Sequence, residues 1–129
     1  MFPRSFDSLD AIVAFTAAFF SGAGIDAGLR PAVDLALEEL FTNMVKYGGA
    51  SRADVEIALA AIPGGVEVTL TDRDVGPFDV TRAPDVDVTR PIEERRPGGL
   101  GLHLVRRMLD SIEYDYVPER RQGRTVFRK

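Results

Sequence analysis

The spacing of apolar residues changes from a helical period to a strand period partway along the chain, and this change decides the class of fold. Residues 8–21 and 31–45 carry apolar side chains at helical spacing, and glycines follow each stretch. Residues 54–59 and 66–70 instead alternate apolar and polar side chains, with a Pro-Gly-Gly turn at residues 63–65. This pattern predicts two helices followed by an antiparallel hairpin.

The same two periods recur in the second half of the chain. Residues 100–109 return to helical spacing, and residues 112–116 and 125–127 alternate around a turn expected near Gln122 and Gly123. Strands joined by short turns, with helices grouped between them, predict a single α+β domain over all 129 residues. We expect a two-layer sandwich with a mostly antiparallel sheet and the helices on one face.

Composition excludes several kinds of site. The chain has no cysteine for a disulfide or a thiolate metal site, and its one histidine cannot form a histidine cluster. A net charge of −4 gives no general basic surface for nucleic acid. The apolar stretch Ala11–Phe20, interrupted by Thr16, is too short to span a bilayer and lacks the basic flank of a signal peptide. We therefore expect a cytoplasmic protein that binds neither nucleic acid nor membrane.

Glu39 and Asn43 lie one turn apart on the second predicted helix, so they share a face. The asparagine carbonyl is a hard oxygen ligand suited to magnesium, which keeps several waters and takes phosphate oxygens. A carboxylate one turn away can orient or deprotonate an attacking hydroxyl or water. Taken alone, however, the two residues are better explained as a solvated pair at the rim of a helix.

Asp72 follows Val66, Val68 and Leu70 in phase, so we expect its side chain to point inward. A buried carboxylate is costly without a partner, and an adenine amino group is one such partner. An aspartate that caps the turn at the end of a strand explains the residue about equally well. Gly76 follows at a position where a close backbone approach would be useful.

Gly98, Gly99 and Gly101 stand at the start of the third predicted helix, after a long stretch without sustained periodicity, residues 76–97. Glycines there let backbone amides approach a phosphate, and the helix N-terminus adds the positive end of its dipole. The run is no Walker loop, since no Gly-Lys-Ser/Thr follows, and no parallel strand leads into it as in a dinucleotide-binding fingerprint. By itself it also fits a flexible hinge. His103, further along this helix, is interpreted as packed or solvated.

In combination these pieces resemble the GHKL ATP-binding superfamily, which includes gyrase, histidine kinases and MutL. The stretch ALEELFTNMVKYG is similar to its N-box, TDRDVGPFD to its first glycine box, and PGGLGLHLVRRMLD to its second glycine box. Within the superfamily the sequence most resembles the small bacterial anti-sigma-factor serine/threonine kinases, from the second helix to the final strand. The resemblance implies the Bergerat-type ATP-binding fold.

The resemblance also implies a role for each matching residue. Glu39 is expected to be the catalytic base and Asn43 the magnesium ligand. The aspartate of the first glycine box is expected to bind the adenine amino group. Asp74 and Gly76 reproduce the Asp-x-Gly spacing of that box, whereas Asp72 is in phase with the strand, and we prefer Asp72. The residues expected along the phosphates are Gly98, Gly99, Gly101 and Leu102, with residues 76–97 as the ATP lid.

The implied activity is that of a protein-serine kinase that uses ATP and magnesium. Such kinases phosphorylate an anti-anti-sigma protein of the STAS type, sequester a sigma factor and often form homodimers. The alternative is a non-catalytic ATP-binding module that switches partners. A histidine kinase is disfavoured, because the only histidine, His103, lies within the glycine box and the chain has no room for a dimerising helix pair.

Overall fold

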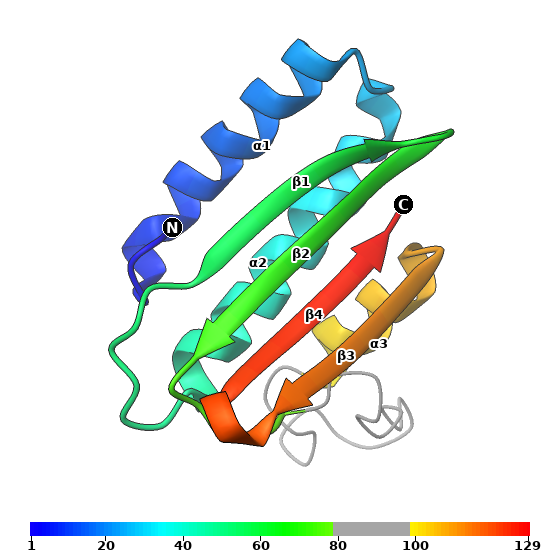
Figure 1. Ribbon diagram of the computed structural model, residues 1–129. Helices are drawn as coiled ribbons and strands as arrows, with labels where there is room; N and C mark the ends of the chain where they lie inside the picture. Colours follow the sequence, from blue (N-terminus) through cyan, green and yellow to red (C-terminus); the bar gives the residue numbers. More distant parts are fainter. Residues whose placement is uncertain (79–98) are drawn as a thin grey trace.

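The computed structural model describes residues 1–78 and 99–129, which form one antiparallel sheet with three α-helices on one of its faces (Figure 1). The strands lie in the order β1-β2-β4-β3. The prediction of a two-layer α+β fold with a mostly antiparallel sheet is therefore confirmed. The elements are α1 (Leu9–Ala23), α2 (Arg30–Tyr47), β1 (Glu56–Ile62), β2 (Gly65–Arg73), α3 (Gly99–Met108), β3 (Ser111–Val117) and β4 (Gln122–Arg128).

The first two helices begin and end close to the predicted positions. α1 follows a 3-10 turn at Phe6–Ser8 and ends where Gly24 adopts a left-handed φ of 66°, which glycine reaches without steric cost. Pro31 lies in the first turn of α2, where its missing N–H costs no hydrogen bond. α2 continues to Tyr47, two residues beyond the last apolar residue of the predicted helix, and this extension places Tyr47 on the helix.

The strands form two hairpins, β1 with β2 and β3 with β4, and β2 pairs with β4 to join them. The first hairpin turns at residues 63–64, as predicted. The turn predicted near Gln122 and Gly123 is wrong, because both residues pair within β4. The chain reverses earlier, at a 3-10 turn over Pro118–Arg120, where proline fixes φ. Arg121 then takes the left-handed φ of 48° that a glycine usually supplies.

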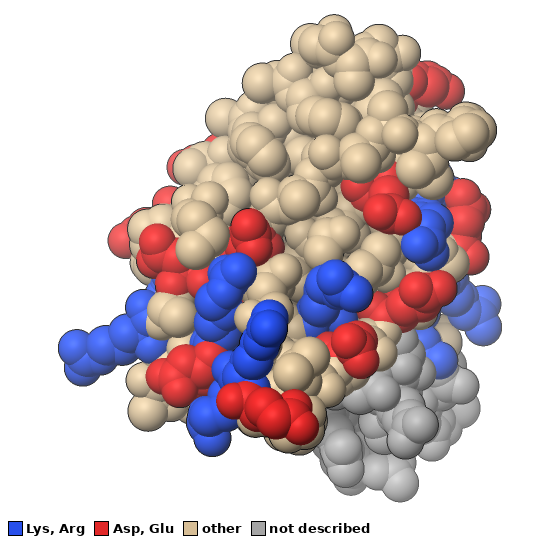
Figure 2. All heavy atoms as spheres, viewed as in Figure 1, with Lys and Arg blue, Asp and Glu red and all other residues tan. Residues whose placement is uncertain are grey.

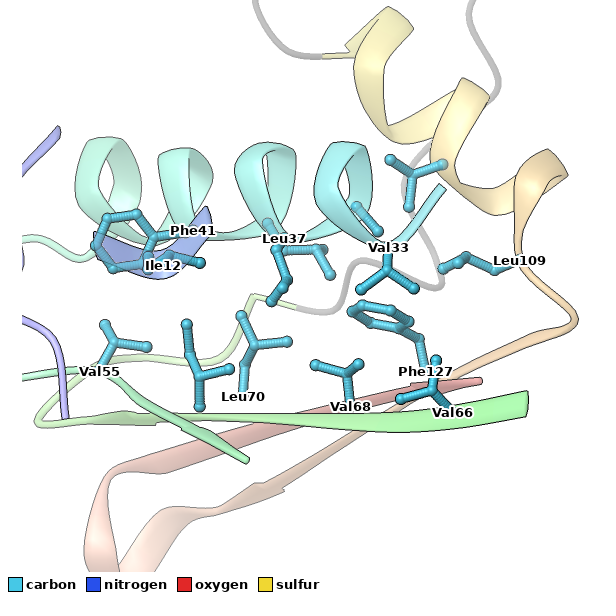
Figure 3. Packing of buried hydrophobic residues seen from close by; sticks show 14 of the residues in the cluster. Ile12, Val33, Leu37, Phe41, Val55, Val66, Val68, Leu70, Leu109 and Phe127 are labelled. Atoms are coloured by element: carbon cyan, nitrogen blue, oxygen red, sulfur yellow. The ribbon is translucent and has the colours of Figure 1, made fainter. Parts of the chain in front are cut away.

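The hydrophobic core lies between α2 and the inner face of the sheet (Figure 3). α2 carries apolar residues three to four positions apart, so they form one stripe that packs on the sheet. The two central strands supply most of the facing side chains. The fully buried members of this layer include Val33, Ala36, Leu37, Leu40 and Phe41 from α2, Val66, Val68 and Leu70 from β2, and Phe127 from β4.

The outer face of the sheet carries charged pairs in place of helices, as the blue and red spheres in Figure 2 show. Arg73 Nη2 lies 2.8 Å from Glu56 Oε2, and Arg128 Nε lies 2.8 Å from Glu67 Oε2. These pairs join neighbouring strands and are about a third or more exposed, so each contributes little to stability. The outer face is largely a solvated surface, whereas the buried polar residues Asp72 and Thr125 lie on the helix side of the sheet.

α1 packs on the core through a narrow stripe that includes Ile12 and Phe20, while Val13 and Phe15 remain 44% and 38% exposed. With the turn before it, α1 gives a window, Phe6–Ala23, that is long and apolar enough to cross a membrane by length and composition. The stretch Ala11–Phe20 lies within this longer window, so its own length does not decide whether the segment could span a bilayer. A core helix and an N-terminal signal sequence meet the same criterion, and 22% of this window is buried.

Candidate functional site

A small pocket lies beside the C-terminal end of α2, over the seam where β2 pairs with β4. Its interior has a volume of about 30 Å³, which is room for a water molecule or two. Residues from both hairpins and from α2 line it, so the pocket exists only when these parts of the chain have come together. Its polar and aromatic lining residues are Asn43, Tyr47, Asp72, Phe78, Tyr114 and Thr125.

Asn43 is the most unusual residue of the pocket. It is only 2% exposed, and neither its side-chain oxygen nor its side-chain nitrogen has a hydrogen-bond partner among the described residues. An unsatisfied buried polar group costs about 1–3 kcal/mol. Because the side chain also lines the pocket, this cost is recovered when a ligand supplies a donor, an acceptor or a cation.

Asp72 points inward, as predicted from its phase on β2, and is 7% exposed. Its Oδ1 accepts a hydrogen bond from Arg4, and its side chain lines the same pocket as Asn43. Asp74 instead adopts a left-handed φ of 57°, and its exposed carboxylate lies 3.4 Å from Arg121 Nε, outside this pocket. The structure therefore brings Asp72 and not Asp74 to Asn43, and the adenine role of Asp72 stays a prediction.

The segment after β2 is held against the pocket by two tyrosines of β3. The Tyr116 hydroxyl donates to the Val75 carbonyl at 2.6 Å, and the Phe78 N–H donates to the Tyr114 hydroxyl at 3.0 Å. Gly76 lies between these two anchors and lines the pocket, with no atom within 4 Å of the place where a Cβ would be. The backbone at Gly76 is therefore open to a ligand, and its predicted role in close approach stays a prediction.

An aromatic pair forms the solvent side of the pocket. The rings of Tyr47 and Phe78 stack with centroids 5.6 Å apart and planes 16° apart, and both side chains are exposed. The interior of the pocket is sized for water, so a base the size of a purine enters only when a lining side chain moves.

Glu39 lies one turn before Asn43 on α2, outside the lining of the pocket and against α3. Burial raises the pKa of the Glu39 carboxyl above its ordinary value; the neighbouring charge of Glu38 adds to this effect and Lys46 opposes it. A Cβ built at Gly101 would overlap the Glu39 carboxyl group. The Glu39 carboxylate can therefore lie in this position because residue 101 has no side chain.

The remaining glycine-box residues lie at the start of α3 or before it. Gly99 is the first residue of α3, so the N-terminus of this helix lies close to Glu39, as the predicted site requires. Leu102 is 6% exposed and packs in the core, so only its backbone could face a phosphate. Gly98 and residues 79–97 of the predicted lid lie outside the described residues.

Arg4, Phe78, Tyr114 and Thr125 belong to this region but carry no predicted role in a site. The alternation along β3 and β4 does place Tyr114 and Thr125 on the same face as Phe127, and the two residues are direct partners in the sheet register. No sequence pattern indicated a role for Arg4 in the site, because arginines are ordinarily solvated.

Comparison with known proteins identifies the type of domain. The family of the histidine kinase-like ATPase domain matches residues 2–127. A protein named serine-protein kinase RsbW, from Halalkalibacterium halodurans, is 26% identical over 85 residues, which cover 63% of this chain and 52% of that protein. The chain thus matches about half the length of this relative. The match over almost all of its residues shows that the chain belongs to the histidine kinase-like ATPase domain family.

Proposed function

We propose that this protein is an ATP-dependent protein-serine kinase that phosphorylates an anti-anti-sigma protein and also sequesters a sigma factor. The observation that carries the proposal is the buried, unpartnered amide of Asn43, one helical turn from a carboxylate whose pKa is raised. Membership of the ATPase family supports nucleotide binding, and the similarity to a serine-protein kinase supports transfer to serine.

The residues present fit the chemistry of this transfer. ATP supplies the γ-phosphoryl group; the serine oxygen bonds to its phosphorus as the bond to the β-phosphate oxygen breaks, and ADP leaves. Glu39 is the group that accepts the proton of the serine hydroxyl. The N-terminus of α3, with its backbone N–H groups and positive dipole end, is suited to the phosphates. Asp72 provides an acceptor for the amino group of the base.

Magnesium fits the oxygen of Asn43. No group of three or more His, Cys, Asp or Glu residues suited to a metal is found within residues 1–78 and 99–129. An ion at this site would therefore take one amide oxygen from α2 and complete its shell with phosphate oxygens and water, as magnesium commonly does. The ion would neutralise charge on the phosphates, and the unpartnered state of the Asn43 oxygen is the feature that supports it.

The direct test is to incubate the purified protein with magnesium, γ-labelled ATP and candidate anti-anti-sigma proteins of the STAS type. We expect label to appear on one serine of one candidate, and to be lost when that serine is replaced by alanine. ATP binding that promotes capture of a partner without any transfer would instead establish the alternative, a non-catalytic partner-switching module. Absence of both ATP binding and transfer would contradict the proposal.

Replacing Asn43 by leucine tests the role of its amide. Leucine has a similar volume and no polar atoms, so Asn43→Leu is expected to stabilise the nucleotide-free protein by about 1 kcal/mol. It is also expected to weaken magnesium–ATP binding at least about tenfold, because the ligand loses a charged hydrogen bond or an ion contact. Chemical denaturation and calorimetric titration measure the two effects. Thr42→Val, on the same helix but outside the pocket lining, is the matched control. Unchanged ATP affinity in Asn43→Leu would show that the amide has no ligand role.

The pH dependence of transfer tests Glu39 as the base. Only the ionised carboxylate accepts a proton, and burial raises its pKa. The transfer rate is therefore expected to fall as the pH is lowered through a pKa above the ordinary glutamate value, with a limiting slope of about tenfold per pH unit. The measurement is kcat/KM against pH over the range in which circular dichroism shows the protein folded. A rate that stays flat below the ordinary glutamate pKa would rule out Glu39 as the base.

A further inference from the structure

Arg4 is buried in the N-terminal segment of the chain, with its side chain 6% exposed. The segment is fixed at the sheet edge by a bridge between Phe2 and Val55, whose backbone hydrogen bonds measure 2.8 and 2.9 Å. Burial of a guanidinium costs free energy unless hydrogen-bond acceptors and a counter-charge surround it. The acceptors that surround the Arg4 guanidinium therefore indicate what its burial achieves.

The guanidinium of Arg4 joins three parts of the chain at the pocket. Nη1 donates to the Met44 carbonyl in the last turn of α2 at 2.9 Å, and Nε donates to the Ala53 carbonyl at 3.2 Å. Nη2 donates to the Arg73 carbonyl at 3.4 Å and to Oδ1 of Asp72, both at the end of β2. All three nitrogens are thus used, and each partner lies in an element that borders the pocket.

Gly48 provides the space for this guanidinium. A Cβ at Gly48 would lie 2.6 Å from Arg4 Nη1 and 2.6 Å from the Met44 carbonyl oxygen. The φ of Gly48 is −74°, so the backbone conformation is open to other residues and the close contact with Arg4 is what favours glycine. The Arg4 guanidinium therefore packs directly against the backbone at Gly48, in space that a larger residue would fill.

We propose that Arg4 is a positioning residue that makes the pocket selective for a purine with a 6-amino group. Its hydrogen bond occupies Oδ1 of Asp72, so the carboxylate keeps a fixed orientation and presents its other oxygen to the pocket as an acceptor. A 6-amino group donates to such an acceptor, whereas a 6-oxo group places a second acceptor against it. The inference rests on the proposed function, since it assumes that ATP occupies this pocket.

Loss of Arg4 should affect selectivity as well as affinity. Without the guanidinium, the Asp72 carboxylate has no counter-charge among the described residues and can rotate, so the oxygen in the pocket is no longer fixed. A purely structural role would weaken the binding of every purine nucleotide by the same factor. The ratio of the dissociation constants for ATP and ITP separates the two roles, because ITP carries a carbonyl in place of the 6-amino group.

The test compares ATP and ITP binding by calorimetry in the wild type, Arg4→Met, Arg4→Lys, Gly48→Ala and Arg52→Met. We expect Arg4→Met to weaken ATP binding about tenfold or more and to reduce the preference for ATP over ITP by a similar factor. Arg4→Lys keeps the charge but cannot reach all the acceptors, so it should give an intermediate preference. Arg52→Met alters an exposed arginine in the loop that contains Gly48 and Ala53, and it should leave the dissociation constants for ATP and ITP unchanged.

Two results would overturn the proposal, and each has a different meaning. Equal weakening of ATP and ITP, or none, in folded Arg4→Lys and Gly48→Ala would reduce Arg4 to a structural residue while leaving the ATP site intact. Failure of the wild type to bind either nucleotide would remove the proposed function itself. The melting temperature of each nucleotide-free variant, measured in parallel, shows which proteins are folded, and Arg4→Lys and Gly48→Ala keep the test decisive if Arg4→Met is unfolded.

Discussion

Glu39→Gln is expected to lower the rate of phosphate transfer to serine by about 10²–10⁴-fold, because the amide cannot accept the hydroxyl proton. ATP affinity should change little, since Glu39 lies outside the lining of the pocket. The two quantities are measured by single-turnover transfer at saturating ATP and by nucleotide titration. Glu38→Gln, on the exposed side of the same turn, is the control and should transfer at close to the wild-type rate.

The stability of Glu39→Gln gives a second and independent readout. The folded-state pKa of Glu39 is raised, so the folded protein holds this proton more tightly than the unfolded chain does, and the ionised form carries a cost at neutral pH. The stability contributed by the protonated form is lost as the pH rises through the folded-state pKa. Glutamine removes that cost, so the variant should melt at a higher temperature than the wild type at pH 7. Wild-type transfer by this more stable variant would exclude Glu39 as the base.

Gly101→Ala is expected to slow transfer by about 10²-fold without destabilising the protein. The added methyl group would overlap the Glu39 carboxyl and push this flexible side chain aside, and displacement of a catalytic group by about 1 Å costs on this order. Alanine is also a better helix former than glycine, by about 0.5–1 kcal/mol, so the stability should hold or rise.

Gly22→Ala is a matched control for this substitution. Gly22 lies in α1, and no atom lies within 4 Å of its Cβ position. It should gain the same helix stabilisation while leaving transfer unchanged. If Gly101→Ala transfers at the Gly22→Ala rate, the position of the Glu39 carboxylate does not limit the reaction. If both Gly101→Ala and Glu39→Gln are slow and the double variant is no slower than Glu39→Gln, the glycine acts through Glu39.

Periodicity predicted the helices and hairpins because each depends on neighbours in sequence. It also predicted that Asp72 points inward, since alternation along a strand fixes the face of each side chain. The β3–β4 turn was misplaced because the left-handed residue there is Arg121 and not the expected glycine. Local rules assign such a conformation to glycine, and only the surrounding structure makes an arginine adopt it.

The pocket could be predicted only in part, for a related reason. Asn43 followed from motif spacing and Asp72 from its phase on the strand, yet the Arg4–Asp72 pair joins residues 68 positions apart and leaves no local pattern. The stack of Tyr47 on Phe78 likewise depends on how the end of α2 meets the segment after β2. Contacts of this kind are fixed by tertiary packing, which a single sequence does not display.

The order of strands has a consequence for how this molecule opens and closes in solution. β4 follows β3 in the chain but lies between β2 and β3, so the sheet consists of two locally formed hairpins joined along one long-range seam. We expect such a seam to form after the two hairpins during folding and to be the line along which the sheet opens locally. The pocket straddles it, with Asp72 on one hairpin and Thr125 on the other. A bound nucleotide would thus contact both hairpins and stabilise the seam between them. Amide hydrogen exchange along β2 and β4 would therefore slow on binding.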